Sequence, residues 1–152
     1  MKRVLVIGYG NTLRGDDAAG VRAAERISAL YPEAACRCVH QLSPEIAADL
    51  AEADEVFFLD ASVIAAEVQA HLLTEAEEEA MPESITVDGR SHFVTPAGLV
   101  RLCKVLYERC PIVWIVGIPA SELDFREELS ERTSEAVDLC VEVVGRLLMA
   151  HP

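Results

Sequence analysis

Apolar runs alternate along the chain with stretches whose apolar residues recur at helical spacing. Runs at residues 3–8, 55–62 and 111–120 are short, rich in β-branched or aromatic residues and bounded by turn residues, which predicts buried strands. Residues 35–42 predict another strand, and the alternating stretch at 67–75 predicts a strand near the edge of a sheet. The pattern therefore contains about five strands.

Four stretches between or after these runs predict helices. They cover residues 17–30, 43–53, 95–106 and 130–150. Ser43, Thr95 and Ser130 stand where an N-cap is expected, and Pro44 and Pro96 follow two of them at the first helical position. The buried face of the third helix is predicted to hold Leu99, Leu102, Val105 and Leu106. The glutamate-rich stretch 75–84 is interpreted as a solvated acidic loop.

Strands separated by helices predict an α/β fold. We expect one three-layer domain over residues 1–152, with a mainly parallel, twisted sheet of about five strands and helices on both faces. In such a sheet the ligand binds beyond the carboxyl ends of the strands, where the strand order reverses.

The net charge of the chain limits the classes of binding partner that we expect. The chain has 13 basic and 26 acidic residues in 152, a formal net charge of −13. Nucleic acids and anionic membranes bind clustered Lys and Arg, so we expect neither partner. An acidic surface favours cations or a basic partner, although it also simply aids solubility.

The cysteines and the length of the apolar runs indicate where in the cell the protein is expected. The five cysteines are odd in number and match no zinc or CxxC spacing, which favours reduced thiols in a cytoplasmic protein. The N-terminal apolar run is too short for a signal peptide, and no run reaches the roughly 20 apolar residues of a membrane helix.

The first loop joins glycines to two adjacent acids. Gly8, Gly10 and Gly15 follow the first strand, and Asp16 and Asp17 stand at the start of the helix. The spacing is not GxGxxG and no GK[ST] follows, while two carboxylates would repel a phosphate at the helix N-terminus. A nucleotide site is therefore disfavoured. One Asp can cap the helix, which leaves the other for the crevice.

Other polar residues follow neighbouring strands. His40 ends the second strand, Asp60 ends the apolar run of the third, and His92 precedes the third helix. Asp17 and Asp60 are expected to face one crevice, because their strands meet at the point where the order reverses. Two carboxylates and an imidazole would form a site for a divalent ion with open positions. His71 and His151 are interpreted as surface residues, and no nucleophile with a positioned base is evident.

Four segments resemble one enzyme family over essentially the whole chain. They are VLVIGYGNTLRGDDAAGVRAAE at 4–25, FFLDAS at 57–62, SHFVTP at 91–96 and VGIPASELDFREELSERTSEAV at 116–137. Together they resemble the nickel–iron hydrogenase maturation endopeptidases. The first segment is the most specific of the four.

The resemblance implies both an activity and a site. Such an enzyme removes a C-terminal extension from the hydrogenase large-subunit precursor after nickel has been inserted. It holds no permanent cofactor, and its nickel is supplied by the substrate. The residues implied to recognise that nickel fall on Asp17, Asp60 and His92, the same three that the pattern indicates. Catalysis would be metal-dependent, with the ion as Lewis acid or water activator.

Several points stay open at the level of sequence. Some family members have Glu at the position of Asp17, and some have an Asp-Gly-Gly turn where this chain has HQLSPE. His40 is thus an extra ligand, a contact to the precursor or a plain strand-end residue, and Asp16 is a cap or a general base. Alternative functions are a non-catalytic nickel-sensing chaperone of hydrogenase assembly and, less favoured, a small-molecule or nucleotide-binding enzyme.

Overall fold

A five-stranded sheet runs through the middle of the protein. The structure, a computed structural model, describes residues 2–79 and 94–150. The strands are β1 (Val4–Tyr9), β2 (Ala35–Val39), β3 (Glu55–Ser62), β4 (Gln69–Leu72) and β5 (Ile112–Pro119). Their order is β2-β1-β3-β5-β4, and every neighbouring pair is parallel except β4 and β5. The predicted mainly parallel sheet is confirmed, with the short strand β4 at one edge.

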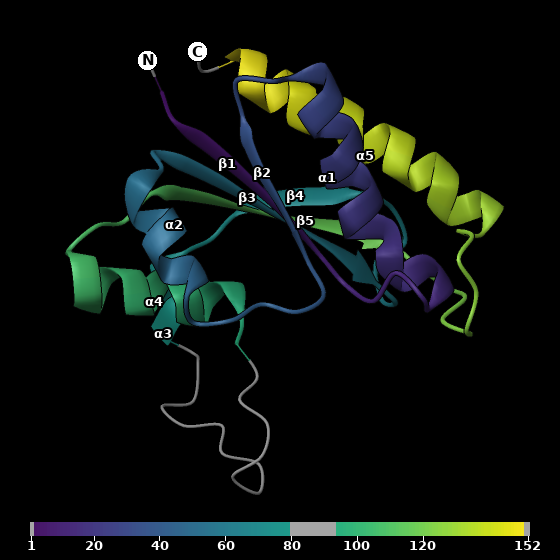
Figure 1. The fold of residues 1–152 in the computed structure, drawn as a ribbon, viewed down its shortest axis with the longest axis horizontal. Coiled ribbons are helices and arrows are strands. Elements are labelled where there is room, and N and C mark those ends of the chain that lie inside the picture. Colours follow the sequence, from purple (N-terminus) through teal and green to yellow (C-terminus); the bar gives the residue numbers. More distant parts are fainter. Residues whose placement is uncertain (1, 80–93, 151–152) are drawn as a thin grey trace, which may run out of the picture.

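Helices cover both faces of the sheet, as predicted. They are α1 (Ala19–Leu30), α2 (Ile46–Glu52), α3 (Glu75–Glu79), α4 (Pro96–Tyr107) and α5 (Glu131–Ala150), with a 3-10 turn, η1 (Gly15–Ala18), ahead of α1. Helices α1 and α5 pack on one face, and α2 and α4 pack on the other (Figure 1). The result is the three-layer α/β arrangement expected from the alternating pattern.

Alternate residues of the central strand fill two hydrophobic cores. Val56 and Phe58 of β3 point to the α2/α4 face, whereas Phe57 and Leu59 point to the α1/α5 face, and all four are fully buried. Phe57 also stacks on Trp114 of β5, with ring centroids 6.2 Å apart. Because β3 is buried on both faces, its sequence reads as a continuous apolar run.

The predicted helix starts are partly confirmed. The Thr95 hydroxyl accepts the backbone N–H of Gly98, and the Ser130 hydroxyl accepts that of Thr133, so both residues are N-caps. The assignment of Ser43 as N-cap is wrong. Helix α2 begins later, at Ile46, and the Ser43 side chain bonds to Glu45 instead.

Two further expectations about packing are wrong in part. An acidic loop was predicted for residues 75–84, but residues 75–79 form helix α3, whose buried Glu78 accepts a hydrogen bond from Lys104 of α4 at 2.6 Å. Residues 80–84 lie outside the described residues. On α4 itself, Val105 and Leu106 are exposed. The buried face is formed by Ala97, Leu99, Val100 and Cys103. Leu99 is buried as predicted and Leu102 packs partly against the same core, but Val100 and Cys103 take the buried positions predicted for Val105 and Leu106.

The strand order reverses at β1. The chain passes from β1 through α1 to β2 on one side, and then through α2 to β3 on the other side. The carboxyl ends of β1 and β3 therefore flank the position at which a ligand binds in sheets of this type. Gly20 at the start of α1 permits this close packing, because a Cβ there would lie 2.2 Å from the carbonyl oxygen of Leu59.

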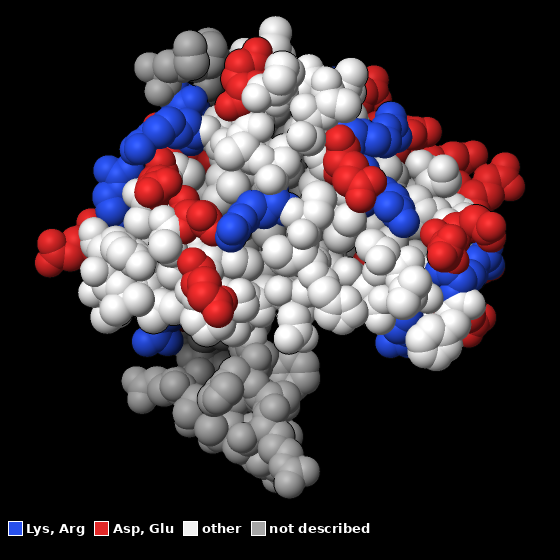
Figure 2. Space-filling model, in the orientation of Figure 1, with Lys and Arg blue, Asp and Glu red and all other residues white. Residues whose placement is uncertain are grey.

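On the face shown in Figure 2, acidic and basic side chains are interspersed. The formal net charge of the whole chain is −13. The five cysteines all lie among the described residues and form no disulfide.

No helix in the described part of the chain is both long and apolar enough to span a membrane.

Candidate functional site

In the loop after β1, the side chain of Asp17 folds back and contacts the backbone of the same loop. Gly10 has a φ of +145°, a conformation that other residues rarely adopt, and a Cβ there would lie 2.0 Å from the carbonyl oxygen of Asp17. This contact lets the Asp17 carboxylate accept the backbone N–H of Asn11 at 2.7 Å. The half-buried Asp17 is thereby held at the carboxyl end of β1.

Asp60 lies at the carboxyl end of the neighbouring strand. The register that pairs Gly8 with Leu59 sets Tyr9 beside Asp60, and the Tyr9 hydroxyl donates a hydrogen bond to the Asp60 carboxylate. Both residues face the α2/α4 side and line one surface groove. Asp60 is therefore oriented by a side chain of β1.

The ionisation of Asp60 reflects burial and a second acid. Burial raises its pKa, the negative charge of Asp17 raises it further, and hydrogen bonds from Tyr9 and the Ala61 N–H oppose the rise, leaving a pKa of about 6. The pKa of Tyr9 is raised by burial and by the charge of Asp60. Two partly desolvated carboxylates with like charge make a position that a cation would stabilise.

Asp16 has a different role from its neighbour. Its carboxylate is fully buried and accepts the backbone N–H groups of Ser121, Glu122 and Ser130 at 2.7–2.9 Å, together with the hydroxyls of Ser121 and Ser130. Burial opposes its ionisation, but these donors outweigh burial and hold the pKa of Asp16 well below its usual range. Asp16 thus fastens the loop before α5 to the loop after β1.

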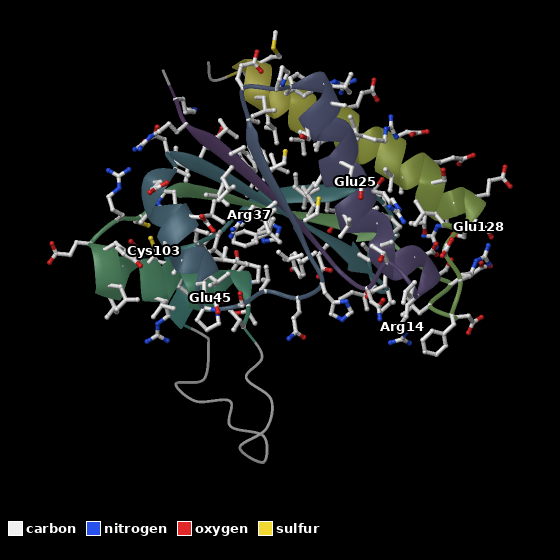
Figure 3. All side chains as sticks on the ribbon, viewed as in Figure 1. Arg14, Glu25, Arg37, Glu45, Cys103 and Glu128 are labelled. Carbon is white, nitrogen blue, oxygen red and sulfur yellow. The ribbon has the colours of Figure 1, made fainter. Side chains whose placement is uncertain are left out.

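This attachment continues along the backbone of both loops. Gly15 N–H donates to the carbonyl of Arg126, and Arg126 N–H donates to that of Leu13. Arg14 and Glu128, labelled in Figure 3, mark these two loops at the same edge of the molecule. Since the η1 turn has no side-chain cap, Asp16 is not the helix cap that its sequence position suggests.

The predicted site is thus assembled in part. Asp17 and Asp60 come together at one edge, whereas His92 lies outside the described residues and its role stays a prediction. His40 is exposed at the end of β2, beside the loop that begins at Gly10, whose N–H bonds to the Val39 carbonyl. Within residues 2–79 and 94–150, no group of three or more His, Cys, Asp or Glu side chains forms a ready metal site.

Two residues that line a groove with Asp60 were not predicted from the sequence. Tyr9 belongs to the GYGN segment, and the two-residue period of strands would have placed it on the same face as Asp60. His71, interpreted as a surface residue, lines the same groove as Asp60 and pairs with Glu77 at 3.2 Å. No sequence signal gives the antiparallel direction of β4 that puts His71 there. His151 lies outside the described residues.

Several solved structures of hydrogenase maturation enzymes have a similar fold. A hydrogenase 2 maturation peptidase from a Thaumarchaeota archaeon is 27% identical, with a TM-score of 0.70 and with 97% of this chain and 98% of that chain covered. The nickel–iron hydrogenase maturation protease HycI from Thermococcus kodakarensis is 22% identical, with a TM-score of 0.72 and coverage of 97% and 93%. The hydrogenase maturating endopeptidase HybD from E. coli is 21% identical, with a TM-score of 0.72 and coverage of 98% and 94%.

No family model matches the chain, and no curated protein matches it significantly. The structural likeness nevertheless covers nearly the full length of this chain and of its neighbours. The resemblance to the hydrogenase maturation proteases seen in the sequence is thus confirmed by solved structures that share this fold.

Proposed function

We propose that this protein is a cytoplasmic endopeptidase that removes the C-terminal extension of a nickel–iron hydrogenase large-subunit precursor. Cleavage follows nickel insertion, and the enzyme recognises the nickel already held by the precursor. The observation that carries the proposal is the pairing of Asp17 and Asp60 at the edge where the strand order reverses. The resemblance to maturation proteases indicates the class of reaction. The two neighbouring carboxylates explain why a cation would bind at this site.

The chain provides an incomplete set of ligands, which suits an ion that arrives with the substrate. The Asp17 and Asp60 carboxylates offer oxygen ligands, and His92 would add an imidazole nitrogen. Thiolates of a precursor site bind such ions far more tightly than an open pair of carboxylates does. The enzyme would therefore contact the ion without extracting it. The ion then acts as a Lewis acid on the scissile carbonyl or activates a water molecule.

Asp16 does not serve as general base in this proposal. A general base must reach the proton that it removes, and it works best with a pKa near the operating pH. The Asp16 carboxylate is fully buried, its oxygens are occupied by donors from the loop before α5, and its pKa is held low. Its contribution to activity is the position of the two loops that flank Asp17.

We propose further that the resting enzyme needs no bound metal to fold. The two hydrophobic cores are formed by strands and helices away from the candidate ligands. A chelator should leave the unfolding temperature unchanged, as judged by thermal unfolding followed by circular dichroism. A fall of several degrees on chelation would identify a structural metal and contradict this part of the proposal.

The direct test compares nickel-loaded and nickel-free precursor as substrates for the purified protein. We expect loss of the C-terminal extension, seen by mass spectrometry, only from the loaded precursor. A protein that binds the loaded precursor without cutting it would instead be a nickel-sensing chaperone. Equal cutting of both precursors would contradict recognition of nickel and leave only the peptidase activity.

A further inference from the structure

A groove of about 460 Å³ extends from the candidate site across the end of the sheet. At one end it is lined by Tyr9 and Asp60, and at the other by Ile115 and His71. The loop from β3 to β4 forms a wall with Ile64, Ala65 and Ala66. The groove is thus lined by one of the two acids, Asp60, and extends from it over β5.

Gly117 keeps the middle of this groove open. It pairs with Asp60 of β3 on one side and with Gln69 of β4 on the other, so it lies at the centre of a row that crosses three strands. Residues of β5 alternate between faces, and Ile115, two residues earlier, packs on the α2/α4 side. A side chain at position 117 would therefore project into the groove.

The backbone does not require glycine at position 117. The residue is not among the glycines with positive φ, and a Cβ there would meet only Ser62 Cβ, at the ordinary contact distance of 3.7 Å. Glycine inside a strand weakens the strand, and it often marks a place where a ligand or another backbone comes close. Position 117 therefore keeps space open for an occupant at the expense of local stability.

The lining indicates what kind of occupant fits. Ile64, Ala65, Ala66 and Ile115 are apolar, and Ile64 is 92% exposed, although a side chain of its size normally gains from burial. The groove is continuous with the candidate site through Asp60. An extended peptide with its reacting bond near the paired acids would place a neighbouring side chain over Gly117.

We propose that this groove is a substrate subsite, which receives an apolar side chain of the precursor next to the bond that is cut. The inference rests on the proposed endopeptidase function and adds a specificity element to it. Gly117 sets the depth of the subsite, and Ile64 covers the bound side chain. Steric fill of the subsite should weaken substrate binding without harm to the fold.

A series of side chains of increasing volume at position 117 tests this. Gly117→Ala, Gly117→Val and Gly117→Leu should lower kcat/KM for the nickel-loaded precursor progressively, by about 10–100-fold for Leu, mainly through KM. The unfolding temperature should hold or rise in the Ala and Val variants, because both side chains suit a strand better than glycine does. Ala48→Leu, on the exposed side of α2, is the matched control and should cut normally.

A second variant covers the case in which Gly117→Leu does not fold. Ile64→Asp changes an exposed loop residue, so the fold should persist while kcat/KM falls about tenfold from the loss of apolar contact. Binding of a synthetic tail peptide, followed by fluorescence anisotropy, should weaken in parallel in the Gly117 and Ile64 variants. This binding does not depend on cleavage.

The outcomes separate the subsite from the function on which it rests. If the wild-type protein fails to cut the loaded precursor, the proposed function is wrong. If the wild-type protein cuts, and folded Gly117→Val, Gly117→Leu and Ile64→Asp variants all cut with unchanged KM, the subsite is wrong and the function stands. A wild-type protein that instead forms a dimer broken by Ile64→Asp would assign the groove to a second copy of this chain and overturn the proposal.

Discussion

Strand β3 carries one acid at each end, and the two acids have opposite surroundings. At the amino end, Glu55 is 1% exposed, accepts a hydrogen bond from the Trp114 indole N–H at 3.1 Å and forms an ion pair with Lys2 at 3.7 Å. At the carboxyl end, Asp60 faces a second acid, Asp17. A cation of the chain already neutralises the first acid, whereas the second lies beside more negative charge.

This difference separates an acid used for structure from one available to a ligand. At Glu55 one carboxylate oxygen accepts the Trp114 indole N–H, while the other is buried without a hydrogen-bond partner in the described part of the chain and is balanced by the Lys2 ammonium, which makes the buried charge tolerable. The charge of Asp17 raises the pKa of Asp60, and a metal cation bound between the two carboxylates would offset the same repulsion. The unbalanced charge at one end of β3 thus identifies that end as the place for a cation from outside the chain.

The largest expected effect is on cleavage at the unbalanced end. Asp17→Asn and Asp60→Asn should each lower processing of nickel-loaded precursor by at least about 100-fold, because each removes a charged oxygen ligand. His92→Ala should lose roughly 10–100-fold for the same reason. Rates from a gel-shift or mass-spectrometric assay would measure these losses.

Glu55→Gln is the matched control at the other end of the same strand. It makes the same change of carboxylate to amide, and it should leave the cleavage rate within about twofold of the wild type. A loss of cleavage in Glu55→Gln as large as that in Asp60→Asn would mean that either change damages the sheet, and the contrast between the two ends would be lost.

The next largest effect is on stability, at Asp16. Asp16→Asn replaces an acceptor oxygen by an amide and leaves buried backbone N–H groups without a partner, which should cost about 2–4 kcal/mol of unfolding free energy. Urea unfolding at pH 7 measures the loss. A loss below about 0.5 kcal/mol would contradict the anchoring role.

The pH dependence of the Asp16 contribution follows from its lowered pKa. A carboxyl whose pKa is lower in the folded state stabilises that state at pH values above the unfolded pKa. The difference between wild type and Asp16→Asn should therefore be complete at neutral pH and shrink as the pH falls below about 4. A difference that persists unchanged into strong acid would point to packing in place of ionic hydrogen bonds.

At Asp60 we expect a smaller change in unfolding free energy, and here the substitution should stabilise the protein. Because its pKa is raised to about 6, its contribution to stability is complete below the unfolded pKa and is lost as the pH rises through 6. Asp60→Asn should thus be more stable than the metal-free wild type at pH 7.5, by on the order of 1–2 kcal/mol after allowance for solvent screening.

Glu55→Gln should change stability in the opposite direction. It loses the ion pair with Lys2 and should be destabilised by about 1 kcal/mol at the same pH. Thermal unfolding at pH 5.0 and 7.5 provides both comparisons. If Asp60→Asn were destabilised at pH 7.5, the carboxylates at the carboxyl end would be part of the stabilising framework.

The smallest effect is expected at His40. This side chain is exposed beside the loop that begins at Gly10, and no hydrogen bond or ion pair was found for it among the described residues. His40→Ala should keep at least about half of the wild-type rate and change stability by less than about 0.5 kcal/mol. A tenfold loss would make His40 a contact for the precursor or its metal.

The meeting of Asp17 and Asp60 could be predicted from the sequence. Both residues follow apolar runs whose parallel direction is fixed by the intervening helices, and the carboxyl ends of parallel strands share one edge. The different roles of Asp16, which holds two loops together, and Asp17, which lies near Asp60, could not be predicted. The partners of Asp16 lie more than 100 residues away along the chain, and no local pattern identifies them.

Other features could not be predicted because they also depend on contacts between elements that are distant in the sequence. The apolar residues of α4 fit two overlapping faces, and only contact with α2 and the sheet selects the face with Val100 and Cys103. His71 reaches the groove because β4 pairs antiparallel to β5, a direction that strand length and alternation do not encode. The open position at Gly117 becomes informative only once its neighbours across the sheet are known.

The most direct test of the account is a single comparison of precursor cleavage by Asp60→Asn and Glu55→Gln, both folded, with nickel-loaded precursor as substrate. Glu55→Gln should release the C-terminal extension at close to the wild-type rate, and only from loaded precursor, while Asp60→Asn should release almost none. Wild-type cleavage by Asp60→Asn, or the same loss in both variants, would contradict the claim that the paired acids at the carboxyl end of β3 recognise the substrate's nickel.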